Sequence, residues 1–463
     1  MLKKIVLVIA ITLVAGGAYG VNYLRDIGAI ASGYVSQTLC TNVLMLGRDL
    51  AEVEASDLSA QQHEITTSSV KKNGTVETTV RIGPISYTTS SVYRPGLGCS
   101  NLAGEKLEDV LAIGLDGHEE EDRGGVTWPS VKREVPGVDF AKLDTIVDRA
   151  FTETTDDIYQ AQNTRAVLVH YKGELVAERY ADGFDGDTPL RGMSMTKSAS
   201  ATVIGILVGQ GRLDIHEPAP VRGWSELSDG RSRVTTHHLL KMIGGFDYKE
   251  AAESDPRNLL STMLFSVPDA SGLAAQTRLR GEPGNNWEYQ TVHSVLLQEV
   301  IRTVIADDQA YFSFAQEQLF GKLGMSNSFF QADAAGTFIG GALMYASGRD
   351  WMKLGLLYLN DGVHEGERIL PEGWVEYAVT PSQASSSKRA YGAQIWLNTP
   401  APKQLFPGMP EDAYAFQGHY GQHVIVIPSL ELVVVRMGMT FNGEKGFDKQ
   451  AFLRGVVEAL PAG

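Results

Sequence analysis

The feature that most constrains the fold is a pair of strand-rich segments that lie far apart in the chain. The segment "TRAVLVHYKGELVAERYADG" predicts a β-hairpin that turns at Lys172-Gly173. Near the C-terminus, "GQHVIVIPSLELVVVRMG" predicts a second pair of apolar strands, turning at Pro428-Ser429. A long stretch of mostly helical pattern separates the two. We therefore expect both ends to build one sheet, with the helical stretch as an insert over one of its faces.

The 463 residues divide into three parts by composition and pattern. Residues 1–26 form an apolar N-terminal segment, residues 27–135 are rich in Thr, Ser and Val, and residues 136–463 carry the paired strands. In the second part, "TTSSVKKNGTVETTVRIG" predicts two strands joined by a tight type I′ turn at Asn73-Gly74. The acidic "GHEEEDRGG" predicts a solvated linker shortly before the boundary near residue 135.

The N-terminal segment has the pattern of an export signal. Two lysines precede an uncharged run from Ile5 to about Tyr23, which is close to the roughly 20 residues that a membrane helix needs. The small residues of "AGGAYG" are also typical of a signal cleavage site. Lysines before the run favour a chain whose bulk lies outside the cytoplasm, so we expect a periplasmic or membrane-anchored protein. A buried N-terminal helix is the alternative.

The two cysteines, Cys40 and Cys99, follow the export segment closely. In an oxidising compartment such a pair predicts a disulfide, with two buried thiols as the alternative. The formal net charge of −15 would repel phosphate backbones, so nucleic acid is not an expected partner. The sequence does not indicate an oligomeric state.

A serine and a lysine three residues apart open a long apolar run. Residues from Ser194 to Gln210 favour a helix, and Gly211 is a natural stop. Positions i and i+3 share a helix face, so Lys197 is expected beside the Ser194 hydroxyl. Burial would lower the pKa of the lysine and let it take the serine proton. The alternative is a capping serine with an exposed lysine. The same spacing recurs in polar stretches at Ser68/Lys71, Ser69/Lys72 and Ser385/Lys388.

Signatures of other chemistries are missing from the sequence. There is no G-x-S-x-G elbow, H-E-x-x-H helix or P-loop. The pair His237-His238 more simply flanks a helix start than binds a metal. We expect neither a metal nor an organic cofactor.

Three segments, taken in order, resemble the signature blocks of a known family. They are "RGMSMTKSASATVIGILVGQGRLDIHEP", "EPGNNWEYQTVHSVLLQEVI" and "FQGHYGQHVIVIPSLELVVVRMG". Together they resemble the class C β-lactamase-like serine hydrolases, which include esterases, 6-aminohexanoate-dimer hydrolases and D-alanyl-D-alanine peptidases. The resemblance covers roughly residues 140–460. It implies an α+β fold of the β-lactamase/transpeptidase type, with an antiparallel sheet flanked by helices and a small β-rich region in front.

The resemblance implies roles for residues in the first two blocks. Ser194 would be the acylated nucleophile and Lys197 its base or proton relay. Tyr289 would pass a proton between Ser194 and the leaving group, either as a phenolate or as a phenol hydrogen-bonded to a lysine. A partly buried core tyrosine is the alternative. Thr291 would contact substrate where the β-lactamases have Asn.

In the third block, "HYG" lies where the lactamases have Lys-Thr-Gly, so His419, Tyr420 and Gly421 would line the substrate site. The amides of Gln422 and Ser194 would form the oxyanion hole. A histidine in place of a fixed cation weakens recognition of a penicillin carboxylate. A structural histidine at the strand edge, with no role in the chemistry, is the alternative for His419. We therefore expect hydrolysis of small-molecule esters or amides. A β-lactamase or D-alanyl-D-alanine peptidase is the alternative, and a non-catalytic binding scaffold is a third reading.

Overall fold

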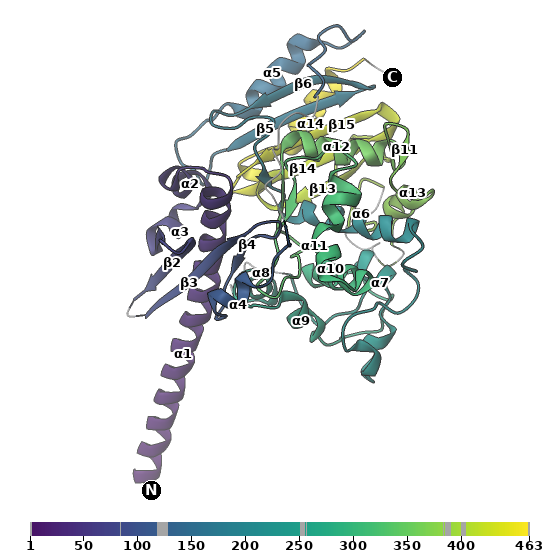
Figure 1. Ribbon diagram of the computed structural model, residues 1–463. Coiled ribbons are helices and arrows are strands. Elements are labelled where there is room, and N and C mark those ends of the chain that lie inside the picture. The colour runs from purple at the N-terminus through teal and green to yellow at the C-terminus, as the bar shows by residue number, and fades with distance from the viewer. Residues whose placement is uncertain are drawn as a thin grey trace.

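The computed structural model describes residues 2–83, 85–117, 128–250, 255, 257–382, 384, 390–399 and 404–461. Side-chain surroundings are described from Gly20 onward, apart from Glu444. The centre of the molecule is a six-stranded antiparallel sheet in the order β12-β13-β14-β15-β5-β6 (Figure 1). Its strands are β5 (Thr164–Tyr171), β6 (Glu174–Tyr180), β12 (Trp396–Leu397), β13 (Tyr414–Gly418), β14 (Gln422–Ile427) and β15 (Leu432–Gly438). The predicted sheet built from two distant ends is confirmed, as are both predicted hairpins.

Helices cover both faces of this sheet because its strands are apolar on both sides. In β5, Val167 and Val169 face α5 (Phe140–Phe151) and α14 (Lys449–Glu458). Ala166 and Leu168 alternate with them and face the larger core, which includes α6 (Thr196–Gly209) and α12 (Gly348–Leu359). β15 pairs with β5, so the C-terminal hairpin completes the layer that the first hairpin begins.

The insert between β6 and β12 is mostly helical, as expected. Besides α6 and α12 it holds α7 (Thr236–Leu240), α8 (Leu259–Phe265), α9 (Ala270–Ala275), α10 (Thr291–Ile305), α11 (Asp308–Ala315) and α13 (Trp374–Val379). Short strands add a three-stranded sheet of β7 (Leu190–Arg191), β8 (Phe329–Phe330) and β9 (Met344–Ala346), and a pair of β10 (Val363–His364) and β11 (Glu367–Arg368). The histidine pair lies at the start of a helix, α7, as predicted, and Thr235 caps that helix.

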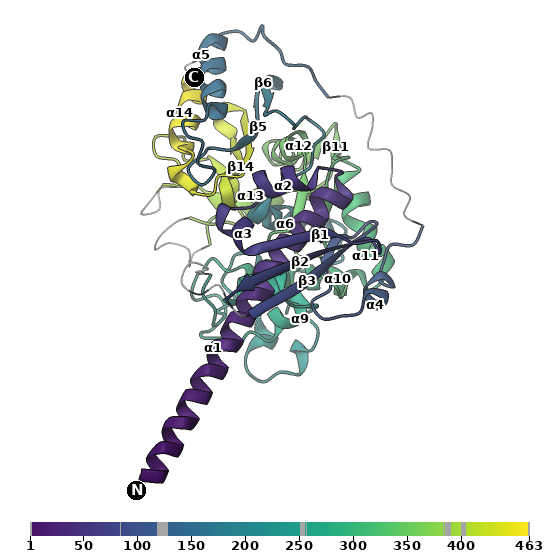
Figure 2. The same cartoon turned by 90° about the vertical axis from the view of Figure 1, so that its left-hand side faces the viewer.

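The chain begins with one long helix, α1 (Leu2–Leu39), which projects from the body at its N-terminal end and enters the fold at its C-terminal end (Figures 1 and 2). A π-helical turn, Cys40–Met45, follows it. This continuation past residue 26 was not predicted. Within the described part of the chain, no helix combines the length and the apolar character that crossing a bilayer requires.

A small mixed domain follows α1 and packs on it. It contains α2 (Leu50–Asp57), α3 (Ala60–Ile65), α4 (Leu107–Leu111) and an antiparallel sheet of β1 (Thr66–Val70), β2 (Thr75–Ile82), β3 (Ile85–Arg94) and β4 (Gly98–Asn101). We refer to residues 20–117 as the N-terminal module. The predicted disulfide is confirmed: Cys40 and Cys99 are bonded, with their α-carbons 6.0 Å apart, and join the end of α1 to β4. The predicted acidic linker lies almost wholly outside the described residues, so the boundary near residue 135 stays a prediction.

The hairpin between β1 and β2 is confirmed, but the predicted turn type is wrong. A type I′ turn needs positive φ at both central residues. Here Gly74 has φ +77°, whereas Asn73 is not among the residues with positive φ. The loop runs over four residues, and the amide of Gly74 donates to the Lys71 carbonyl. The extra loop length removes the need for two left-handed residues.

The N-terminal module contacts the hydrolase body through buried polar groups. Asp57 binds the Arg165 guanidinium at the start of β5 through both carboxylate oxygens, at 2.7 and 2.9 Å. Asn101 donates to the Phe265 carbonyl at the end of α8. Thr38 accepts a hydrogen bond from Arg191, three residues before Ser194. The module therefore supports the strand that leads to the serine.

Candidate active site

Ser194 lies in a 3-10 turn, Met193–Met195, immediately before α6. Met193 holds a left-handed φ of +49°, an uncommon conformation for a side-chain-bearing residue. Gly192 has no room for a side chain, because a Cβ there would lie 2.3 Å from the Trp351 ring. The backbone is thus fixed on the N-terminal side of Ser194, which is itself half-buried at the start of a helix.

Lys197 lies one turn further along, where the i, i+3 spacing placed it. Its Nζ donates to Ser194 Oγ at 3.1 Å and to the Gly341 carbonyl at 2.6 Å. The side chain is 1% exposed. Burial lowers the pKa of Lys197 to about 8, and the negative charge of Glu250 opposes that shift. The lysine can therefore lose its proton near neutral pH.

Tyr289 is the third residue of the expected catalytic group, and it lies beside Ser194 and Lys197. The Lys197 ammonium lies 5.3 Å from the centre of its ring, and its hydroxyl shares a hydrogen bond with Ser194. The ring stacks on Trp396 of β12 with centroids 5.0 Å apart. Burial and the Glu250 charge raise the pKa of Tyr289 well above its ordinary value, although the Ser194 bond lowers it slightly. Tyr289 is therefore a phenol, rather than a phenolate, at neutral pH.

The "HYG" segment forms the turn between β13 and β14. His419 is exposed, and its ring lies 4.1 Å from that of Tyr420. Tyr420 has a left-handed φ of +61°, and its side chain lies against Tyr34 of α1 and the edge of Phe441. Gly421 has φ +81°. Tyr420 therefore links the turn to the N-terminal module.

A buried arginine holds this turn in place. Arg436 of β15 is 1% exposed and donates to the carbonyls of Tyr420 and Gly421. It also donates to the Thr440 hydroxyl and lies over the Phe447 ring. Burial lowers the pKa of this guanidinium to about 9, which leaves it charged at neutral pH. The turn beside the serine thus rests on a buried cation.

The predicted oxyanion donor Gln422 begins β14 and pairs with Gly418 across the hairpin. Its buried side chain donates to the Gly438 carbonyl and accepts from the Gly438 amide. Gly418 lies directly on the serine loop, because a Cβ there would be 2.3 Å from the Gly192 carbonyl oxygen. The Gln422 amide stays a prediction, and this contact makes the amide of His419, which follows Gly418, a second candidate donor.

Thr291 is buried, and its polar groups are used within the fold. Its amide donates to Glu250 at 2.8 Å, and its hydroxyl makes a very short hydrogen bond to the same carboxylate. Sequence reasoning missed Glu250, which lies 41 residues before Thr291 in an irregular segment. It also missed the Gly341 carbonyl that binds Lys197. Neither residue belongs to a local pattern that could have revealed it.

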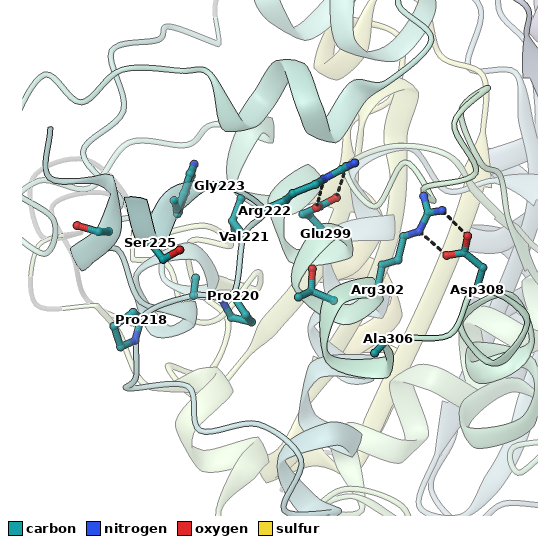
Figure 3. A pocket seen from close by; sticks show the side chains of 14 residues that line it. Pro218, Pro220, Val221, Arg222, Gly223, Ser225, Glu299, Arg302, Ala306 and Asp308 are labelled. Carbon is teal, nitrogen blue, oxygen red and sulfur yellow. Dashed lines mark hydrogen bonds and ion pairs between the residues drawn. The ribbon is translucent and has the colours of Figure 1, made fainter. Parts of the chain in front are cut away.

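A cavity of about 710 Å³ lies elsewhere, between the segment Pro218–Ser225 and the C-terminal half of α10 (Figure 3). Ser194, Lys197 and Tyr289 do not line it. Its charged groups pair with one another, Arg222 with Glu299 and Arg302 with Asp308. In the described ranges, no cluster of three or more His, Cys, Asp or Glu side chains is placed to hold a metal ion. We therefore assign the chemistry to the serine site.

Most of the chain is similar to known proteins. The family model described as Beta-lactamase matches residues 150–458. The chain is 26% identical over 302 residues to the 6-aminohexanoate-dimer hydrolase of Paenarthrobacter ureafaciens, covering 59% of this chain and 72% of that protein.

Solved structures share the fold. The hydrolase EstCE1, described as having promiscuous acyltransferase activity, superposes with a TM-score of 0.55 at 18% identity, over 70% of this chain and 99% of that one. A penicillin-binding protein homologue from Caulobacter crescentus gives 0.53 at 16% identity, over 72% and 99%. The family model matches most of the chain, and the buried Lys197 donates a hydrogen bond to the half-buried Ser194. This chain therefore belongs to the β-lactamase family and is a serine hydrolase.

Proposed function

We propose that the protein hydrolyses ester or amide bonds of small molecules through an acyl-enzyme on Ser194. The observation that carries the proposal is the 3.1 Å contact between Lys197 Nζ and Ser194 Oγ in a buried setting, with Tyr289 on the same hydroxyl. Support also comes from the similarity to an amide hydrolase. The exposed His419 at the place of the lactamase lysine favours esters and amides over penicillins.

The geometry supports a simple course of proton transfers. Ser194 Oγ forms a bond to the carbonyl carbon while its proton moves to neutral Lys197, and the carbonyl oxygen becomes an oxyanion. Backbone amides at Ser194 and at the turn after Gly418 would stabilise that charge, each by roughly 3–4 kcal/mol. Tyr289 then gives its proton to the departing oxygen or nitrogen and regains one from Lys197. Water cleaves the acyl-enzyme by the same steps in reverse.

The lowered pKa of Lys197 predicts the pH dependence of the reaction. Because the neutral amine is the base, kcat/KM is expected to rise with pH and to level off above about 8. Well below that value, activity should fall about tenfold per pH unit. Tyr289 adds no limb in this range because its pKa is raised. The profile is measured with a p-nitrophenyl ester in buffers of constant ionic strength, and a flat profile between pH 6 and 9 would contradict Lys197 as the base.

Covalent labelling tests the proposal directly. A fluorophosphonate probe is expected to modify the protein once, and peptide mass spectrometry should place the adduct on Ser194. Labelling should be faster at pH 8 than at pH 6. Nitrocefin, tested in parallel, should remain intact, and its rapid cleavage would make the β-lactamase alternative the better reading. A chain that neither reacts with the probe nor cleaves either substrate would favour the non-catalytic scaffold.

We propose further that the protein is exported and either loses its first residues or stays anchored by them. The apolar run from Ile5 to about Tyr23 supports this proposal, as does the disulfide at the end of α1, since disulfides persist in oxidising compartments. Fractionation of producing cells, followed by intact-mass measurement, separates the two forms. A reduced, full-length protein in the cytoplasmic fraction would contradict the proposal.

A further inference from the structure

The segment Phe246–Glu250 is fixed against the N-terminus of α10. Gln290 is the N-cap residue of this helix, but its side chain makes no cap bond. Instead it reaches back and donates to the carbonyls of Phe246 and Tyr248. Two residues beyond Tyr248, the chain delivers the Glu250 carboxylate to the first turn of α10.

Glu250 takes over the capping role. One carboxylate oxygen accepts the Thr291 amide and the other accepts the Thr291 hydroxyl. A negative charge is favourable at this end of a helix. The charge of this carboxylate also acts on the neighbouring Tyr248 and helps to raise its pKa. Glu250 thereby joins its own segment to the start of α10, two residues after Tyr289.

The carboxylate also faces the catalytic groups. The Thr291 methyl group packs on Gly341, where an added Cβ would lie 2.4 Å away, and the Gly341 carbonyl accepts from Lys197. Among the described residues, Glu250 is the one charged group that acts on Lys197, and it also acts on Tyr289. Four other groups that carry an exchangeable proton face Glu250 or Lys197. They are Ser194 before α6, Tyr289 before α10, Tyr248 on the Glu250 segment and Tyr391 before β12.

We propose, building on the proposed function, that Glu250 is a positioning residue that fixes the start of α10 and sets how protons are shared between Lys197, Tyr289 and Ser194. Burial alone would lower the pKa of Lys197 further. The Glu250 charge works against this, so the lysine stays protonated until pH approaches 8. The same charge adds to the effect of burial in raising the pKa of Tyr289, which can donate its proton as a phenol. Glu250 acts through its neighbours and does not need to touch the substrate.

The substitution Glu250→Gln tests the charge while keeping the shape. Without the charge, the pKa of Lys197 falls, so the acidic limb of kcat/KM is expected to move to lower pH. At pH 6 the variant should therefore retain a larger fraction of its own plateau activity than the wild type does. Glu250→Asp keeps the charge but shortens the reach, so its limb should stay in place while kcat drops. An unmoved limb in Glu250→Gln would overturn the proposal.

Thr291→Val supplies a second test that preserves the carboxylate. It removes one of the bonds that hold Glu250, so kcat should fall without a shift of the pH limb. The combined Glu250→Gln/Thr291→Val variant should lose less than the product of the two single losses, because both changes break one contact. If the loss in the combined variant equals the product of the two single losses, Glu250 and Thr291 act independently, which would contradict a shared role in positioning. This variant pair keeps the test valid even if one variant folds poorly.

Glu288→Gln is the matched control. This carboxylate directly precedes Tyr289 but pairs with Arg280 at the surface, and its pH profile should equal that of the wild type. A shift of the same size would show that any nearby charge suffices and would overturn the assignment. Fluorophosphonate labelling separates the two proposals. If wild-type Ser194 is not labelled, the proposed function fails, whereas a labelled Glu250→Gln protein with an unmoved limb rejects the role of Glu250 alone.

Discussion

Replacing Ser194 by Ala is expected to lower kcat/KM for p-nitrophenyl butyrate by on the order of 10⁴-fold or more. The loss is this large because Lys197 and Tyr289 both act through the serine hydroxyl, so its removal leaves them without a partner. Binding of the ester should change little, since only one oxygen is removed from a half-buried side chain. Steady-state kinetics give the rate, and an equilibrium competition assay with a product analogue gives the affinity.

Ser68→Ala is the matched control for this variant. Ser68 also precedes a lysine by three residues, but it lies in β1 of the N-terminal module, and its hydroxyl binds Thr78. Three-residue spacing on a strand does not bring the two side chains together as it does on a helix. This variant should keep wild-type activity. Residual ester hydrolysis in Ser194→Ala that matches the wild type would mean that another group is the nucleophile.

Replacing Asp57 by Asn is expected to cost roughly 3–5 kcal/mol of folding free energy. Asp57 is 4% exposed and accepts from Arg165 and Arg48. The variant therefore removes the counter-charge of the buried Arg165 and leaves Arg48 with Glu52 alone. Burial would raise the pKa of Asp57, but the arginine charges outweigh it and hold the pKa at about 2. The stabilisation is therefore complete above about pH 4 and is lost as the pH falls through about 2.

Urea unfolding at pH 7 measures this loss, and limited proteolysis shows where the structure opens. We expect cleavage near the junction of the N-terminal module and β5, because the Asp57–Arg165 pair spans it. Glu77→Gln removes an exposed ion pair with Lys71 and serves as the control, with a cost near zero. Equal unfolding midpoints for Asp57→Asn and the wild type would show that the buried pair does not stabilise the junction.

The parts of the fold that local patterns determine were predictable. Alternating apolar residues gave the hairpins, and the i, i+3 spacing placed Lys197 on Ser194. The extension of α1 to Leu39 was not predictable, since Gly28, Ser32 and Gly33 favour helices weakly. Tertiary contact explains it: a Cβ at Gly33 would lie 2.1 Å from the Phe265 carbonyl oxygen, so close packing compensates for the weak propensity.

The site was predictable only where its residues carry a motif. Ser194, Lys197 and Tyr289 lie in recognisable blocks, and the structure brings them together. Glu250 lies in an irregular segment whose position depends on the Gln290 side chain, a contact that no spacing rule anticipates. Likewise, Gly418 at the end of β13 contacts Gly192, which lies far away in the sequence, so no local pattern reveals this contact.

The unbroken course of α1 has a mechanical consequence. From Tyr23 to Tyr34 the helix advances about 16 Å without a break, and the Tyr34 side chain lies against Tyr420 in the turn between β13 and β14. A helix behaves as a stiff rod over this length, whereas a flexible tether would let the body swivel. Anything that fixes the projecting part of α1 would therefore also fix the orientation of the hydrolase body.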